Sequence, residues 1–284
     1  MKSSPLQTAL LTVAAMVAFA SNSLLNRLAL GQETIDAASY TTIRLTSGAV
    51  MLFVIAYFQR ENGTAFVRGS WVSAAFLFLY AITFSSAYLS LTTGTGALIL
   101  FGSVQMTMMI AALRSGERPH VLEWMGLFLA LAGLVYLVFP GLTAPSPLGS
   151  TLMTVAGISW GFYSIRGRGS QNPLASTAGN FIYSVPMILV VLLISSSNIS
   201  ISSNGVLYAV LSGALTSGLG YVIWYAALRG LTTTRAATVQ LSVPVIAAWS
   251  GVVLLAEHVS ARLLIAGVLI LGGIALAVSS RAKV

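Results

Sequence analysis

The chain has 284 residues, of which 57% are hydrophobic and only 7% charged, and its mean hydropathy is +0.90. Soluble domains carry about 25% charged residues, so this composition excludes an ordinary water-soluble fold and indicates a protein whose solvent is lipid. The formal net charge of +8 could suggest nucleic acid, but the Lys and Arg residues are scattered between apolar runs without a basic patch. We therefore expect no nucleic-acid partner.

The chain divides into apolar segments of about 20 residues, the length that a membrane helix needs. Polar, Gly and Pro residues separate these segments, and the connections between them are short. The first segment could instead be a signal peptide, but it opens a regular series of similar segments, which favours a membrane helix. The predicted spans are residues 6–29, 35–58, 70–91, 95–113, 121–139, 148–166, 174–195, 204–228, 234–255 and 261–280.

The distribution of basic residues orients this set of spans. With a cytoplasmic N-terminus, two basic residues, Arg27 and Arg262, lie at outer ends, and Arg44 lies within a span. The inner ends then hold Lys2, Arg60, Arg68, Arg114, Arg118, Arg166, Arg168, Arg229, Arg235, Arg281 and Lys283. Because cytoplasmic loops are enriched in Lys and Arg, this bias predicts ten spans with both termini in the cytoplasm.

Two parts of the chain resemble each other at a constant offset. The segment "AYLSLTTGTGALILFGSVQ" (87–105) aligns with "AALRGLTTTRAATVQLSVP" (226–244), and the two Glu residues Glu117 and Glu257 follow at corresponding places. We interpret this as a duplication, with repeats at 1–140 and 150–284 and a linker at 141–149. Because each repeat holds five spans, the second crosses the membrane in the opposite sense, an architecture typical of transporters.

These features together resemble the EamA type of the drug/metabolite transporter superfamily. The resemblance rests on "TIRLTSGAVML", the turns "LTTGTGA" and "LTTTRAA", the proline-bearing "VQLSVPVIAAW", and the motifs "SGER" and "LAEH". It implies an all-α, ten-helix carrier of the bacterial inner membrane that exports amino acids, related metabolites or toxic compounds by alternating access. The family often has a proline where this chain has Gln105, so the two halves differ there.

Arg44 is the most informative single residue of the sequence. It lies roughly 14 Å below the outer end of its predicted helix at 1.5 Å per residue, and no Asp or Glu lies at a similar depth. A charge at mid-membrane costs about 3 kcal/mol or more, so the side chain should face the bundle interior. Two interpretations stay open: an anchor for a substrate carboxylate, or a structural strut between helices.

Other polar and aromatic side chains within the spans are candidates for the wall of a central cavity. Asn22 and Asn26 share one helix face and either contact Arg44 or line the cavity. Gln105 and Gln240 could form hydrogen bonds between helices instead of lining the cavity. Trp160 and Trp224 could pack in the core instead. The predicted cavity residues are Asn22, Asn26, Arg44, Tyr80, Gln105, Trp160, Tyr163, Tyr183, Trp224 and Gln240, and the helices are predicted to break or kink at Pro186 and Pro244.

Several residue types are absent from places where other functions would need them. The first span holds no acidic residue, so we expect a permanently cationic cargo to be disfavoured. No His lies inside a span, Asp36 lies at the rim of one, and there is no phosphate-binding or dinucleotide motif. We therefore expect no enzyme activity, no cofactor and no metal. A channel, a drug exporter or a non-transport membrane subunit remain alternatives, and the sequence does not indicate the oligomeric state.

Overall fold

The computed structural model describes residues 4–30, 34–59, 67–91, 93–139, 146–195, 199–255 and 261–279, without the side chains of 93–94 and 251–255. Apart from one isolated β-bridge, the regular structure of these residues is helical. The helices are α1 (Pro5–Leu30), α2 (Ala37–Phe58), α3 (Trp71–Ala87), α4 (Thr93–Arg114), α5 (Val121–Val138), α6 (Pro147–Gly167), α7 (Pro173–Ile194), α8 (Ser203–Leu211), the π-helix η3 (Ser212–Leu219), α9 (Gly220–Leu228), α10 (Thr233–Val239), α11 (Ser242–Leu255) and α12 (Ala261–Ser279).

Each of the predicted apolar segments is occupied by a helix or a run of helices. The segment 204–228 contains α8, η3 and α9 in one continuous run, and the segment 234–255 is divided into α10 and α11. Among the described residues, 7 helices are long and apolar enough to cross a membrane, namely α1, α2, α4, α5, α7, α12 and the run Ser203–Leu228. Helix α3 is apolar but shorter.

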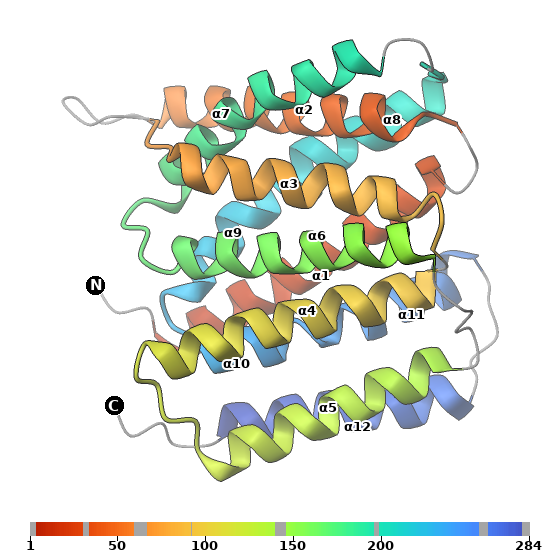
Figure 1. Ribbon diagram of the computed structural model, residues 1–284. Helices are drawn as coiled ribbons and strands as arrows, with labels where there is room; N and C mark the ends of the chain where they lie inside the picture. The colour runs from red at the N-terminus through yellow and green to blue at the C-terminus, as the bar shows by residue number, and fades with distance from the viewer. Residues whose placement is uncertain are drawn as a thin grey trace.

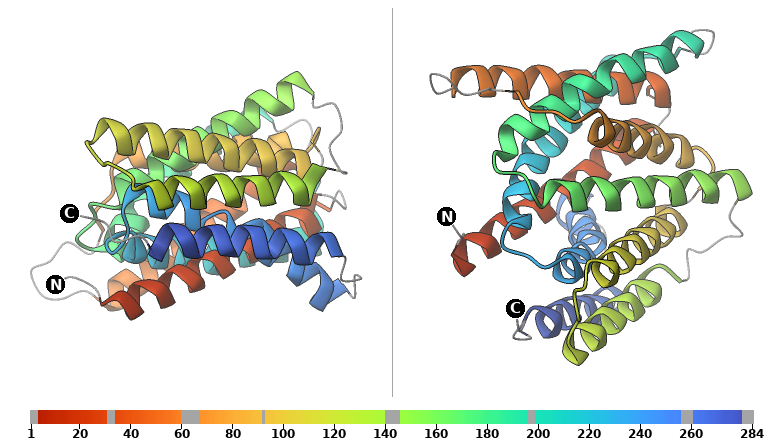
Figure 2. Two further views of the ribbon diagram at one scale, coloured as in Figure 1. Left: turned by 90° about the horizontal axis from the view of Figure 1, so that it is seen from below. Right: turned by 60° about the vertical axis from the view of Figure 1, so that its left-hand side comes forward.

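The helices lie roughly along one direction and form layers (Figure 1). Helices α5 and α12 pack side by side at one edge, and α2, α7 and α8 form the other edge. Between these edges lie α3, α4 and α6 on one face, with α1, α9, α10 and α11 behind them (Figure 2). The described chain begins and ends at the same end of the bundle, which we call the termini end; the other is the distal end.

Local sequence explains where several helices start. Asp36, Ser146, Asn172, Ser202 and Thr232 each precede a helix, and their side chains accept a hydrogen bond from a backbone N–H of its first turn. Proline is the first residue of both α6 and α7, where a missing N–H costs no helical hydrogen bond.

Glycine sets the close packing of α5 against α12. A Cβ atom at Gly126 would meet the backbone of Gly273, and a Cβ atom at Gly273 would meet the backbone of Gly126. Such close backbone approach is a common basis of helix association where lipid removes the hydrophobic driving force. The faces of this pair that point away from the bundle carry exposed Phe128 and Val268, as a lipid-facing surface requires.

Candidate functional site

A cavity lies in the middle of the bundle, and helices from both halves of the chain form its wall. Its water-accessible volume is about 40 Å³, which is room for a few water molecules. The space in this structure is therefore small. The lining residues are Phe19, Asn22, Ser23, Tyr80, Phe84, Leu100, Phe101, Val104, Trp160, Tyr221, Gln240 and Val243.

Aromatic rings form much of this wall and pack against one another. The ring centroid of Phe19 lies 5.2 Å from that of Trp160 and 5.7 Å from that of Tyr221, both in edge-on geometry. Trp160 also lies 5.0 Å from Tyr80 and 4.8 Å from Tyr221. Edge-on and tilted ring pairs of this kind are favourable, and they hold α1, α3, α6 and α9 together around the cavity.

Arg44 lies behind two of these rings. Its side chain is 1% exposed, its Nη2 donates to the Tyr221 hydroxyl at 2.8 Å, and its Nε donates to Ser217 Oγ at 3.0 Å. The guanidinium carbon lies 5.6 Å from the ring centroid of Tyr80, a cation–π distance. Arg44 is thus connected to the cavity through Tyr80 and Tyr221, although it is not itself a lining residue.

The positive charge of Arg44 has no acidic neighbour in the described chain. Asp36, Glu117 and Glu123 are the acidic residues described, and all three lie at helix ends or in connections. The groups that interact with the guanidinium are the Ser217 hydroxyl and tyrosine side chains, and its Nη1 has no hydrogen-bond partner within the described residues. A buried cation with an unused donor is costly, so this site favours a negatively charged partner.

The π-helix η3 explains how Ser217 and Tyr221 reach Arg44. The backbone of α2 and η3 touches closely at Gly213, because a Cβ atom there would meet the carbonyl group of Arg44. Below this contact, Ser217 in η3 and Tyr221 in α9 lie on the same face and both accept from the guanidinium. The π-helix is rare and often marks functional sites.

The two predicted Asn residues of α1 differ in their surroundings. Asn22 lines the cavity, and its Oδ1 accepts from Ser212 at 2.6 Å and from Ser217 at 3.5 Å, so it reaches Arg44 through Ser217. Asn26 is buried one turn away, and neither of its amide atoms has a partner within the described residues. Asn26 is not among the residues that line the cavity.

Gln105 and Gln240 brace the interruption between α10 and α11. Gln105 Nε2 donates to the Ala237 carbonyl at 2.7 Å, which ties α4 to α10. Gln240 lines the cavity, donates to the Ala236 carbonyl at 2.9 Å and accepts from Trp160 Nε1 at 2.6 Å. Two backbone carbonyl groups near the end of α10 therefore accept hydrogen bonds from glutamine side chains, and Trp160 of α6 in turn donates to one of these glutamines.

The two prolines, where a helix break or kink is predicted, lie in different positions within their helices. The interruption in the ninth segment lies at residues 240–241, and Pro244 falls in the first turn of α11, where its missing N–H is not needed. Helix α7 continues through Pro186 as a single element. Proline removes one helical hydrogen bond there, and the packing of α7 against α2 and α3 keeps the remaining turns in place.

The other predicted cavity residues lie outside the lining. Trp224 and Tyr163 are buried on the termini side of the cavity, where Trp224 Nε1 donates to Ser164 at 3.1 Å and the Tyr163 hydroxyl has no partner within the described residues. Tyr183 stacks on Trp71 at the start of α3, with ring centroids 4.7 Å apart. Of the ten predicted residues, Asn22, Tyr80, Trp160 and Gln240 line the cavity.

Sequence reasoning missed Tyr221 and Phe19. Tyr221 lies four residues after Ser217 and three before Trp224, so helical spacing places it on the same face as both. Its sequence context therefore contained a usable signal. The contact between Tyr221 and Arg44 joins residues 177 positions apart, and no local pattern indicates it.

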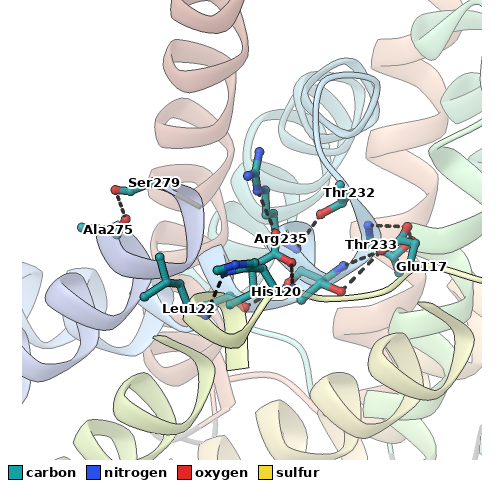
Figure 3. A network of polar contacts seen from close by, with 11 residues as sticks. Glu117, His120, Leu122, Thr232, Thr233, Arg235, Ala275 and Ser279 are labelled. Atoms are coloured by element: carbon teal, nitrogen blue, oxygen red, sulfur yellow. Dashed lines mark hydrogen bonds and ion pairs between the residues drawn. The ribbon is translucent and has the colours of Figure 1, made fainter. Parts of the chain in front are cut away.

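Polar contacts close the termini end of the bundle, as Figure 3 shows for Glu117 and Thr233. Glu117 Oε1 accepts from the Thr233 backbone N–H at 3.0 Å, from the Thr233 hydroxyl at 2.7 Å and from Arg168 Nη1 at 2.6 Å. A second ion pair joins Arg235 to Glu123 at 3.1 Å. Burial raises the pKa of the Glu117 carboxyl, but the hydrogen bonds from Thr233 and Arg168 outweigh burial, so its pKa lies below the ordinary glutamate value. Glu257 lies outside the described residues.

A smaller set of contacts closes the distal end. Ile35 and Ile201 form an antiparallel β-bridge, and Asp36 accepts from the backbone N–H groups of Ser39 and Ser200 at 2.8 and 3.1 Å. Burial raises the pKa of the Asp36 carboxyl, but the hydrogen bonds together lower it by more, so the net pKa is below the ordinary aspartate value. Among the described residues, no group of three His, Asp or Glu side chains is placed to hold a metal.

Comparison with known proteins places the chain in a family. The model of the EamA-like transporter family matches residues 147–279. An uncharacterized protein of Pseudomonas aeruginosa is 50% identical over 275 residues, covering 97% of this chain and 96% of that protein. The chain belongs to the EamA-like transporter family. It is a multi-pass membrane protein, and the family indicates a transporter rather than an enzyme.

More distant relatives carry descriptive names. A protein of Escherichia coli K12 named "Probable amino-acid metabolite efflux pump" is 25% identical over 210 residues, covering 69% of this chain and 70% of that protein. An uncharacterized transporter of Bacillus subtilis is 22% identical, covering 86% of this chain and 88% of that protein. A crystal structure with 20% sequence identity superimposes with a TM-score of 0.81 over 99% of both chains, which shows a shared fold.

Proposed function

We propose that this protein is a secondary transporter of the bacterial inner membrane that exports small metabolites, with amino acids the leading class, by alternating access. The observation that carries this proposal is the central cavity, because α1, α3 and α4 of the first half and α6, α9 and α11 of the second half all contribute to its wall. A binding site between two halves is typical of alternating-access carriers.

The proposed topology has ten membrane crossings, two five-span repeats of opposite orientation (1–140 and 150–284) and cytoplasmic termini. It is supported by the helical character of each predicted segment and by the position of both ends of the described chain at one end of the bundle. The basic residues Arg114, Arg166 and Arg168 are at that same end, as the positive-inside rule requires. The termini end is then the cytoplasmic end.

In this orientation the observed state is closed toward the cytoplasm. The Glu117 contacts with Arg168 and Thr233 join the ends of α4, α6 and α10 on that side. The cavity residues Phe84 and Leu100 lie on the distal side of the bundle centre, since they come late in α3 and early in α4. Loading of a cytoplasmic cargo would require the Glu117 contacts to separate.

The cargo that fits best is a small zwitterion or anion. Among the described residues, the one buried charge beside the cavity is the cation of Arg44, and a cationic cargo would be repelled by it. The name of the Escherichia coli relative supports amino acids as the first class to test. Export of drugs or other toxic organic compounds is the second candidate, which the aromatic wall formed by Phe19, Trp160 and Tyr221 favours.

Counterflow in proteoliposomes tests the proposal. The purified protein is reconstituted with a high internal concentration of one amino acid, and uptake of the labelled amino acid is followed, with and without a pH gradient. We expect saturable uptake that depends on the internal amino acid, for zwitterions or anions and not for organic cations. Exchange of organic cations alone would favour the drug exporter, and no exchange of any compound would favour a non-transport membrane subunit.

A further inference from the structure

We propose that the hydroxyl groups of Tyr221 and Tyr80 bind the carboxylate of the cargo, and that Arg44 acts behind them as the positioning residue. This inference rests on the proposed transport function and adds how the cargo is recognised. In this inference Arg44 has both of its predicted roles. The guanidinium connects helices as a buried structural group, and its positive charge favours a carboxylate at the two tyrosine hydroxyls.

The direction of the hydrogen bond between Arg44 and Tyr221 indicates that Tyr221 can donate to the cargo. Arg has only donors, so the Tyr221 oxygen accepts from Arg44 Nη2 at 2.8 Å. The proton of the Tyr221 hydroxyl is then left for another acceptor. The Ser217 and Tyr80 side chains are within hydrogen-bonding reach of this hydroxyl, and the cavity that Tyr221 lines offers a third direction. An anionic oxygen in the cavity would accept this proton in a charge-assisted hydrogen bond.

Tyr80 supplies the second donor from another helix. It lines the same cavity from α3, and its ring lies under the Arg44 guanidinium at 5.6 Å. Two phenol groups from α3 and α9 therefore share one buried cation. A carboxylate has two oxygens, each of which accepts hydrogen bonds, so a pair of donors suits it better than a single hydroxyl.

The charge balance points to the same ligand class. Arg44 is 1% exposed, its Nη1 has no partner within the described residues, and no described acidic side chain neutralises it. Water-poor surroundings strengthen the attraction between a fixed cation and an entering anion. The rest of the wall is apolar or aromatic apart from Asn22, Ser23 and Gln240, so the carbon skeleton of the cargo should be apolar. The predicted cargo has one carboxylate and an apolar body.

Three compounds with one carbon skeleton test this recognition: leucine, its deaminated analogue isocaproate, and its decarboxylated analogue isoamylamine. Binding to the detergent-purified protein is measured by calorimetry, and KM and maximal rate are measured in proteoliposomes. We expect the wild-type protein to bind leucine and isocaproate and to bind isoamylamine at least tenfold more weakly. Because binding is measured without transport, a protein that binds but moves nothing contradicts the proposed function alone.

The variants Tyr221→Phe and Tyr80→Phe each remove one hydroxyl and keep the ring. Loss of a hydrogen bond to a charged group should weaken leucine and isocaproate binding by about 10- to 100-fold, with a higher KM and a nearly unchanged maximal rate. Tyr163→Phe is the matched control, since Tyr163 is buried in the same aromatic cluster, 6.0 Å from Tyr221 between ring centroids, and its hydroxyl has no partner within the described residues. We expect no change for this variant.

Two results would overturn the inference. The first is equal binding of isoamylamine and isocaproate by the wild-type protein, which would mean that the carboxylate is not recognised. The second is folded Tyr221→Phe and Tyr80→Phe variants that bind the carboxylate compounds as tightly as Tyr163→Phe does.

Discussion

At the scale of single residues, the surroundings of Arg44 set both the stability and the chemistry of the centre. Its donors hold Ser217 of η3 and Tyr221 of α9 against α2. Hydrogen bonds that involve a charged group contribute about 1.5–3 kcal/mol each, which offsets part of the cost of placing the charge at this depth. The sequence predicts that Arg44 faces inward, and the structure shows which groups it meets.

Two substitutions distinguish the effect of the Arg44 charge from the effect of its planar hydrogen-bonding geometry. We expect Arg44→Lys to lower the melting temperature and to raise the KM for carboxylate cargo, because one ammonium group cannot reproduce the planar fork that reaches both Ser217 and Tyr221. Arg44→Gln should weaken carboxylate binding further, since it also removes the charge. Thermal unfolding in detergent and the leucine KM are the measurements. A folded Arg44→Gln protein with unchanged leucine KM would contradict the account.

At the scale of helices, the closest contact between α2 and η3 lies at Gly213. A Cβ atom at Gly213 would meet the Arg44 carbonyl, whereas a Cβ atom at Gly102 in α4 meets nothing within 4 Å. We therefore expect Gly213→Ala to destabilise the protein by about 1–3 kcal/mol, the usual cost of overpacking. Gly102→Ala should be neutral or slightly stabilising. Equal melting temperatures for the two variants would contradict the described packing.

The contacts of Glu117 at the termini end, which is the cytoplasmic end in the proposed topology, form a closure that depends on the charge of its carboxylate. Because its pKa is lowered in the closed state, the stabilisation of closure is present above the ordinary glutamate value of about 4.3. It is lost as the pH falls through the depressed pKa. At neutral pH the closure is intact, so Glu117→Gln should open it by removing the anion that Arg168 and Thr233 bind.

Thiol labelling measures this opening, since the chain has no cysteine of its own. A cysteine placed at buried Met108, between Glu117 and the cavity, should react faster with an impermeant reagent from the cytoplasmic side in Glu117→Gln. Asp36→Asn, which removes a carboxylate at the distal end, is the control and should leave this rate unchanged. Unaltered labelling in Glu117→Gln would show that these contacts do not close the cytoplasmic side.

The helices could be predicted from the sequence better than the site could. Runs of apolar residues bounded by caps locate the helices because length and solvent dictate them. The π-helix η3 and the interruption at 240–241 were not predicted at these positions, because both depend on partners far away in sequence: Gly213 against Arg44, and Gln105 on the Ala237 carbonyl. The same reason explains why Tyr183 was predicted in the cavity although it stacks on Trp71.

At the scale of the whole molecule, the proposed topology makes the two ends of the bundle chemically distinguishable. Cysteines placed at Ser4 and at Ser279, the two ends of the described chain, should react only from the cytoplasmic side of the membrane. A cysteine at Ile199, which is 49% exposed near the distal end, should react only from the outside. Labelling of Ser4 and Ser279 from opposite sides would require an odd number of crossings and would contradict the ten-span account.

The central claim is that the cavity between the two halves carries a small zwitterionic or anionic cargo across the membrane. Counterflow of labelled leucine in proteoliposomes of the wild-type protein tests it most directly. The account predicts saturable uptake that requires internal leucine and that isoamylamine does not inhibit. Uptake that rises linearly with concentration and needs no internal leucine would indicate a channel, and equal inhibition by isoamylamine would contradict the role of the carboxylate.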